Sequence, residues 1–297
     1  MSRPRNELRD RAADTAARAV LRSLGALPYE RRVPAAGALL ARVIGPAAGW
    51  TARARENLAA AFPEMSGAER AALARDVCDN AGRSIAEMYA GDAFIDRLAG
   101  VALTGEGVSA LLAARDAGRP IVAVSGHFGN HNAARAAMTA HGLDLGSLYK
   151  PMRNPLFNVH YEEAMAVMGG QIFPRDRRGM GVMLRHLRKG GMVAILFDLH
   201  VGDGLPIPFF GRPAQTTLAP AELANRYDAL LVPVYAIRNP DGMTFTIRVG
   251  PEAPSGEPAE RMQWLTSDLE TLVRAHPAQW FWIHRRWKEP SGAARRR

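Results

Sequence analysis

The segment from Pro120 to Asn132, P-I-V-A-V-S-G-H-F-G-N-H-N, carries the residues best placed for chemistry. Its four apolar residues predict a buried strand, which ends at Ser125-Gly126 and is followed directly by His127. Gly129 then turns the chain into a helical pattern that begins near Asn130. Open α/β sheets place reactive groups at such strand ends, and histidine is the commonest general base near neutral pH. We therefore expect His127 to act in catalysis rather than to be a structural histidine.

Two further polar residues bear on this histidine. Asn132 stands five residues after it, where an acid would orient the imidazole and stabilise its charged form. An amide oxygen still accepts a hydrogen bond but brings no negative charge. Asp198 directly follows the apolar run 192–197. It is expected to bind a polar group of a substrate, to orient a basic residue, or to cap the following loop.

Basic residues follow two other strand-like runs. Lys150 and Arg153 come after residues 146–149, and Arg175, Arg177 and Arg178 come after residues 171–173. Arginines at successive strand ends form a site for phosphate or carboxylate groups. One such cluster alone would be an ordinary solvated surface. Two clusters at similar topological positions predict an anion-binding cleft beside His127.

Two apolar segments remain open to more than one interpretation. The stretch Pro206–Ala214, P-I-P-F-F-G-R-P-A, fits a wall for an acyl chain, a loop that enters lipid, or a loop folded onto the core. The stretch Trp280–Lys288 alternates aromatic and polar residues and fits an interfacial or closing segment. Nucleic-acid binding is disfavoured for it, because stacked bases need an open aromatic platform.

The pattern from Pro120 onward predicts an α/β fold, because apolar strand-like runs alternate with helical runs. The last two runs, 230–237 and 244–249, are joined by N-P-D-G and predict a hairpin. Residues 1–115 are alanine-rich and helical, with breaks at Pro28, Pro34, Pro46 and Pro63. A capping box, Ser66 to Glu69, opens one of these helices. We expect a helical region (1–115), an α/β domain (116–290) and a basic tail (291–297), joined in one continuous fold.

Composition limits the class of protein and its partners. The 297 residues carry a formal net charge of +9, which implies an anionic partner. The single cysteine, Cys78, excludes an intramolecular disulfide and is expected to be a buried structural thiol. The apolar stretch 34–50 is interrupted by Arg42 and Pro46, so no transmembrane span is predicted. Amphipathic stretches with arginines, 12–27 and 35–44, fit a membrane interface or packing on the domain.

Several blocks in order resemble the late lipid A acyltransferases, the lauroyl/myristoyl acyltransferase family. The resemblance runs from Arg53 to Lys288 and includes R-x-R-E-N-L (53–58), G-H-F-G-N (126–130), Y-K-P-x-x-N-P (149–155), L-R-K-G-G (187–191), P-F-F-G-R-P-A (208–214) and H-P-x-Q-W-x-W-x-H-R-R-W-K (276–288). It implies a glycerol-phosphate-acyltransferase-like mixed sheet flanked by helices. It also implies acyl transfer from acyl carrier protein to a lipid hydroxyl, at the cytoplasmic face of a bacterial inner membrane.

The acceptor that the resemblance implies by default is a lipid A precursor, an anionic membrane lipid. A lysophospholipid or an aminoacyl lipid is the alternative, and a non-catalytic lipid-binding relative is a third reading. No metal, organic cofactor or nucleic-acid partner is implied. His127 is then the base. The expected substrate-binding residues are Lys150, Arg153, Arg175, Asp198, Phe210, Gly211 and Arg212.

One position departs from the family pattern, in which a histidine is followed, after four residues, by Asp or Glu. Here that position is Asn132. Three explanations compete: a chain disabled so that it holds substrate, a natural weak or non-catalytic relative, or compensation by another residue such as Asp198 or His131. The first is favoured because the other blocks are intact. It predicts that Asn132→Asp restores acyl transfer.

Overall fold

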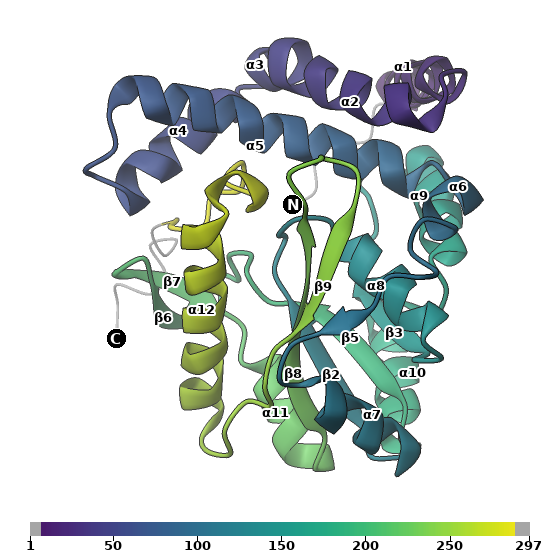
Figure 1. The fold of residues 1–297 in the computed structure, drawn as a ribbon, viewed down its shortest axis with the longest axis vertical. Coiled ribbons are helices and arrows are strands. Elements are labelled where there is room, and N and C mark those ends of the chain that lie inside the picture. Colours follow the sequence, from purple (N-terminus) through teal and green to yellow (C-terminus); the bar gives the residue numbers. More distant parts are fainter. Residues whose placement is uncertain (1–6, 289–297) are drawn as a thin grey trace.

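The apolar runs predicted from the sequence form the centre of a seven-stranded sheet in the computed structural model, which describes residues 7–288 (Figure 1). The strand order is β1-β9-β8-β2-β5-β3-β4. Among the described pairings of this sheet, only β8 with β9 is antiparallel. The predicted α/β class and the hairpin are confirmed. The strands are β1 (Leu103–Thr104), β2 (Ile121–Ser125), β3 (Leu145–Tyr149), β4 (Ile172–Pro174), β5 (Met192–Leu196), β8 (Leu230–Arg238) and β9 (Phe245–Val249).

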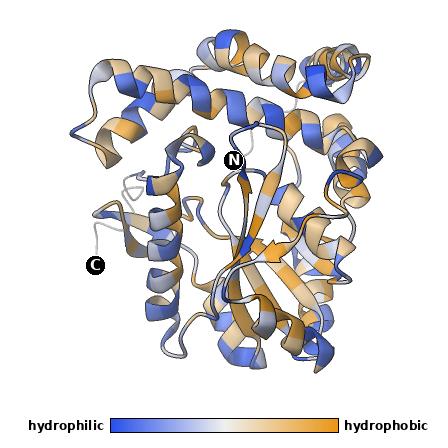
Figure 2. Ribbon diagram, in the orientation of Figure 1, coloured by the Kyte–Doolittle hydropathy of each residue, from blue (hydrophilic) through white to orange (hydrophobic). Residues whose placement is uncertain are grey.

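The sheet is buried on both faces, which explains why its central strands read as continuous apolar runs. Val122 and Val124 of β2 join one core, whereas Ile121 and Ala123 join the other. Figure 2 shows the same pattern, with hydrophobic central strands and helices of mixed character. The first core is covered by α10 (Arg177–Arg188), α11 (Ala219–Tyr227) and α12 (Pro258–Ala275). The second is covered by α7 (Val108–Asp116) and α8 (His131–Ala140).

The N-terminal region is helical, as predicted, and its long helix α5 (Gly67–Met88) crosses one end of the sheet (Figure 1). The capping box of Ser66 and Glu69 opens α5 as expected. The break predicted at Pro34 is wrong, because Pro34 lies inside α2. Close packing of α2 on α5, with Gly82 against Ala36, keeps that turn helical. The other helices here are α1 (Glu7–Gly25), α2 (Tyr29–Leu39), the π-helical turn η1 (Leu40–Ile44), α3 (Gly45–Ala47), α4 (Trp50–Ala61) and α6 (Asp92–Ile95).

The segment Pro206–Ala214, for which a loop was expected, is a β-hairpin. Its strands are β6 (Leu205–Phe209) and β7 (Arg212–Thr216), paired antiparallel. The two turn residues, Phe210 and Gly211, have φ of 52° and 66°. Such a two-residue turn matches the twist of the strands, whereas prolines within the run mask a strand in the sequence.

The helical region and the α/β domain share one sheet, because β1 pairs with β9. The predicted boundary near residue 115 falls in the last turn of α7. Among residues 7–288, no helix combines the length and apolar composition needed to cross a bilayer. The predicted basic tail, 291–297, lies outside the described residues.

Candidate active site

His127 and Asp198 meet at one edge of the sheet because their strands are neighbours in register. Ser125 of β2 pairs with Leu196 of β5, and each polar residue comes two positions later. The His127 Nδ1–H donates to Asp198 Oδ1 at 2.7 Å, and the His127 backbone N–H donates to Asp198 Oδ2 at 2.7 Å. The carboxylate therefore fixes both the position of the residue and the plane of its ring.

Asp198 is a buried carboxylate held by three donors. Its side chain is 1 % exposed, and the indole Nε1–H of Trp280 donates to Oδ2 at 2.9 Å. Burial raises the pKa of Asp198, but the charge and hydrogen bonds of His127, with the Trp280 indole, outweigh burial and lower it to about 2. Asp198 is therefore ionised at neutral pH and places a negative charge beside the His127 ring.

The second ring nitrogen of His127, Nε2, has no hydrogen-bond partner among residues 7–288, and the side chain is 25 % exposed. Phe281 and His131 flank the ring, with centroids 5.9 and 5.6 Å away. Burial, together with repulsion from His127, lowers the pKa of His131 to about 3. His131 is therefore neutral in the physiological range. An accessible Nε2 opposite a charged Asp198 can accept a proton from a bound hydroxyl.

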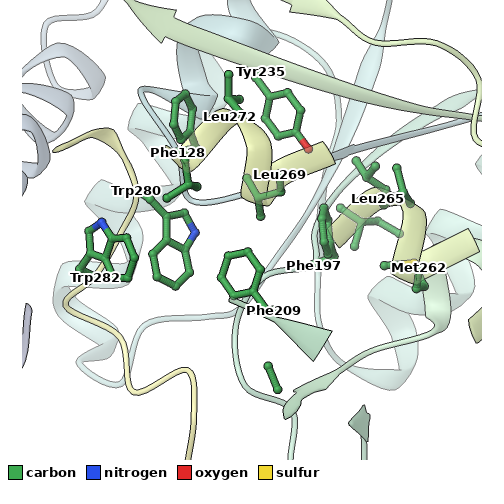
Figure 3. Close-up of a cluster of buried hydrophobic side chains, with 14 of the residues drawn as sticks. Phe128, Phe197, Phe209, Tyr235, Met262, Leu265, Leu269, Leu272, Trp280 and Trp282 are labelled. Atoms are coloured by element: carbon green, nitrogen blue, oxygen red, sulfur yellow. The ribbon is translucent and has the colours of Figure 1, made fainter. Parts of the chain in front are cut away.

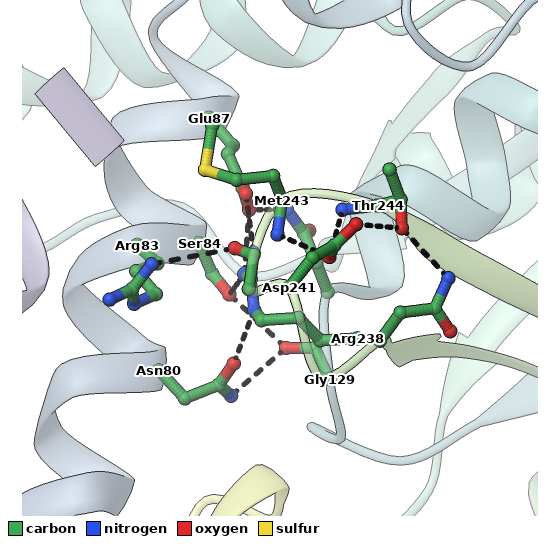
Figure 4. Close-up of polar contacts among 12 residues, drawn as sticks. Asn80, Arg83, Ser84, Glu87, Gly129, Arg238, Asp241, Met243 and Thr244 are labelled. Atoms are coloured by element: carbon green, nitrogen blue, oxygen red, sulfur yellow. Dashed lines mark hydrogen bonds and ion pairs between the residues drawn. The ribbon is translucent and has the colours of Figure 1, made fainter. Parts of the chain in front are cut away.

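The turn after His127 is held by a buried polar network that comes largely from α5 (Figure 4). Gly129 has φ of 54°, and a Cβ there would lie 1.8 Å from the Ala236 carbonyl oxygen, so the turn requires glycine. The Gly129 carbonyl accepts hydrogen bonds from Asn80 and Ser84 of α5, at 3.3 and 3.1 Å. From the other side, the Gly129 N–H donates to the Gln279 carbonyl at 2.8 Å.

A buried ion pair between Glu87 and Arg238 anchors this network. Glu87 Oε2 also accepts a hydrogen bond from the side-chain amide of Asn130, at 2.7 Å. Asn130 in turn caps α8, because its Oδ1 accepts the backbone N–H of Asn132 at 3.0 Å. The Arg238 Nε donates to Asn80 at 2.8 Å. The pair thus ties α5 and β8 to the start of α8.

Asn132 lies buried in the first turn of α8, and within residues 7–288 its side chain makes no hydrogen bond to His127. Asp198, which the sequence offered only as one residue that could compensate for Asn132, contacts Nδ1 instead. Arg135, one turn after Asn132, is also buried, and its Nε and Nη1 have no hydrogen-bond partner in the described chain. Burial lowers the pKa of Arg135 to about 10.

The predicted basic residues lie at the same edge of the sheet as His127. Lys150 and Arg153 follow β3, Arg175 follows β4, and all three are exposed. The Arg175 backbone N–H donates to the Tyr149 carbonyl at 2.8 Å, so the two basic segments adjoin. The structure brings both clusters together, but their role in binding an anion stays a prediction.

Trp280, which donates to Asp198, belongs to a buried cluster of aromatic and aliphatic side chains (Figure 3). Trp280 lies 5.2 Å from Phe209 and 4.7 Å from Trp282, between ring centroids. Phe210 is buried in the same cluster, its ring 5.5 Å from Trp282, while Gly211 forms the hairpin turn. The exposed Arg212 lies over the Trp287 ring at 5.2 Å. The hairpin and the C-terminal segment thus pack on each other through this cluster. A substrate-binding role for residues 210–212 stays a prediction.

Comparison with known sequences identifies the family of this chain. Residues 6–289 match the sequence model of the bacterial lipid A biosynthesis acyltransferase family. The chain belongs to this family. It is therefore an acyltransferase by family, and the resemblance stated from its motifs is confirmed.

Relatives of this lipid A acyltransferase family member carry three kinds of name. Lipid A biosynthesis lauroyltransferase of Escherichia coli is 27 % identical over 249 residues, which cover 81 % of this chain and 80 % of the relative. Lipid A biosynthesis acyltransferase of Haemophilus influenzae is 25 % identical over 173 residues, 57 % of this chain and 54 % of the relative. Phosphatidylinositol mannoside acyltransferase of Mycobacterium tuberculosis is 25 % identical over 142 residues, 46 % of this chain and 44 % of the relative. The last two matches thus span about half of each relative.

Several residues that shape the site were not identified from the sequence as its members. Trp280 belongs to the motif of residues 276–288, but its sequence neighbours do not indicate that its side chain contacts Asp198. Asn80, Ser84 and Glu87 are spaced by four and three residues, which places them on one helix face. That line of uncharged and acidic polar residues on one side of the helix is the signal that could have revealed them.

Proposed function

We propose that this protein is an O-acyltransferase that moves a fatty acyl chain from acyl carrier protein to a hydroxyl of a membrane lipid, with His127 as base and Asp198 as the acid that supports it. A lipid A precursor is the first candidate acceptor, at the cytoplasmic face of a bacterial inner membrane. The observation that carries the proposal is the His127–Asp198 hydrogen bond at the sheet edge, in a chain of this acyltransferase family.

The reaction balances with these groups alone. His127 Nε2 takes the proton from the acceptor hydroxyl while its oxygen attacks the thioester carbonyl carbon. The tetrahedral intermediate collapses, the carbon–sulfur bond breaks, and Nε2 returns the proton to the leaving thiolate. Asp198 stabilises the imidazolium that exists between these steps. No residue needs to carry the acyl chain covalently.

The exposed Lys150, Arg153 and Arg175 support binding of an anion beside the base, either a phosphate of the acceptor or that of phosphopantetheine. A lysophospholipid or an aminoacyl lipid remains the alternative acceptor. The similarity to a protein named phosphatidylinositol mannoside acyltransferase supports an acceptor other than lipid A as this alternative.

The activity is tested by incubating the purified chain with radiolabelled acyl carrier protein thioester and either a lipid A precursor or a lysophospholipid. Transfer of label to one lipid, and its loss in His127→Ala, is expected. Lipid analysis of cells that lack the protein then names the natural acceptor as the lipid that loses one acyl chain. Vesicle binding without any transfer from the wild-type chain would favour the non-catalytic, lipid-binding alternative.

The role of Asp198 is tested against that of position 132 with two matched variants. Asp198→Asn keeps the shape of the side chain and removes its charge, and it is expected to lower kcat on the order of 10⁴-fold, as the same change does in serine proteases. Asn132→Asp is expected to leave kcat close to that of the wild type, because the Nδ1 of His127 is already held by Asp198. A large gain in Asn132→Asp would instead support a chain disabled at position 132, and normal turnover in Asp198→Asn would refute Asp198 as the partner.

A further inference from the structure

Most of the exposed large apolar side chains belong to two neighbouring segments of the chain. Of nine such residues in the described chain, six belong to α1 or to the segment 152–167, which contains α9 (Pro155–Val167). Single exposed apolar residues are ordinary, whereas a contiguous group marks an interaction surface. We call this surface the α1–α9 face. Its apolar members are Leu8, Val20, Met152, Leu156, Val159 and Val167.

α1 and α9 lie side by side along their length. Near one end, the side-chain amide of Asn154 donates to the Asp10 carbonyl oxygen at 2.8 Å. Near the other end, Leu21 and Val167 line the same hollow of about 360 Å³. Contacts at both ends make α1 and α9 neighbours, near α5 and α6 in Figure 1, and the exposed Val167 of α9 lines the hollow that the two helices share.

The outward stripe of α9 is surplus to what the fold needs. Leu156 and Val159 are 43 % and 52 % exposed and lie one turn apart on the same side of the helix. The core side of α9 is already supplied by Ala164 and Met165, which are buried. A helix that is apolar on its solvent side as well as on its core side has a second apolar surface to cover.

Exposed cations border this surface. Lys150 and Arg153 directly precede α9. Arg175, Arg177 and Arg178 follow the neighbouring strand β4, and the Arg175–Tyr149 hydrogen bond of 2.8 Å holds the two segments together. Glu163 is an exposed carboxylate within the face, and Asp176, beside the arginines, caps α10 at Gly179. Cations therefore exceed carboxylates around an apolar centre.

We propose that the α1–α9 face lies on an anionic lipid bilayer, with Leu156 and Val159 at the boundary between headgroups and acyl chains and the five cations at the lipid phosphates. Apolar side chains ringed by Lys and Arg have the chemistry that such an interface recognises. Because β3 and β4 end at the same sheet edge as β2, this orientation presents the edge that holds His127 to the lipid. The inference rests on the proposed function, because it names the surface through which a membrane-lipid acyltransferase would meet its bilayer.

The test is sedimentation of the full chain with phosphatidylcholine vesicles, with and without phosphatidylglycerol. The double variant Leu156→Glu/Val159→Glu is expected to weaken binding about tenfold or more, because two charges enter the interface. Leu205→Glu is the matched control: Leu205 is 41 % exposed, but it lies on the β6–β7 hairpin. It is expected to bind as the wild type does, and phosphatidylglycerol is expected to strengthen wild-type binding.

Two outcomes would overturn the inference: wild-type vesicle binding by the double variant, or an equal loss in Leu205→Glu, which would assign the contact to the hairpin. Unchanged thermal unfolding of both variants excludes a folding defect. His127→Ala, tested in parallel, is expected to bind vesicles normally. Loss of acyl transfer with intact vesicle binding therefore concerns the catalytic proposal, and loss of vesicle binding by the double variant concerns the face.

Discussion

At the scale of single residues, the Asp198 carboxylate is defined by its donors. The backbone N–H and Nδ1–H of His127 and the indole of Trp280 all point at its two oxygens, at 2.7 to 2.9 Å. Hydrogen bonds to the charged form of a carboxylate stabilise that form even in a buried position. The carboxylate is thereby held ionised and fixed, which is what an imidazole base requires of its partner.

Trp280→Phe removes one of these donors and keeps an aromatic ring in the cluster. The loss of a hydrogen bond to a charged group, on the order of 2 kcal/mol, is expected to raise the pKa of Asp198 and to lower kcat about tenfold or more. KM is expected to change little. Steady-state kinetics of acyl transfer measures both constants.

Trp282→Phe is the control for that variant, because its indole donates to the Pro277 carbonyl oxygen at 2.7 Å in the same buried cluster. It is expected to lower stability in a similar way but to leave kcat closer to that of the wild type. Equal losses of kcat in the two variants would mean that packing, and not the bond to Asp198, explains the effect.

At the scale of elements, α5 positions the turn that carries His127 through the buried Glu87–Arg238 pair. Glu87→Gln leaves an uncompensated guanidinium in the core, which is expected to lower the free energy of unfolding by about 3–5 kcal/mol. It also weakens the hold on Asn130, so kcat is expected to fall more than KM rises. Chemical denaturation and steady-state kinetics below the denaturation midpoint measure the two effects.

Asp79→Asn offers the comparison on the same helix. It breaks an ion pair with Arg83, in which the side chains of Arg83 and Asp79 are 20 % and 31 % exposed. An exposed pair of this kind contributes about 0.5 kcal/mol. If Glu87→Gln loses stability but retains the wild-type kcat, the pair supports the fold without positioning the turn.

The sequence predicted where the strands begin and end better than it predicted which strands lie side by side. Local periodicity located β2, β5 and β8 to within about a residue or two. It could not reveal that β5, and not β3, lies beside β2, because pairing order depends on contacts far apart in the chain. For that reason both His127 and Asp198 were identified at strand ends, while their hydrogen bond emerged only from the register of the two strands.

At the scale of the whole molecule, the same limit applies to charge. The net charge of +9 predicts an anionic partner, but it does not say which face meets it. Amphipathic patterning indicated the N-terminal helices, because residues in one helix are close in sequence. The part of α9 in the proposed bilayer-facing surface could be inferred only from the fold, which places α9 against α1.

Two half-buried histidines couple the stability of the molecule to pH. Burial, with repulsion from His127, lowers the pKa of His131 to about 3, and burial lowers that of His284 to about 4. In the unfolded chain both titrate near 6.5. Between these values the unfolded chain binds more protons than the native one, so stability falls as the pH falls.

The free energy of unfolding is therefore expected to decrease from pH 7 to pH 5, with each histidine contributing at most about 1.4 kcal/mol per pH unit. Urea denaturation at pH 7, 6 and 5 measures this slope. His131→Gln is expected to flatten it, since the side chain no longer takes up a proton on unfolding. His141→Gln, at an exposed position, is the control and is expected to leave the slope nearly as in the wild type. A wild-type slope in His131→Gln would show that other groups govern the acid sensitivity.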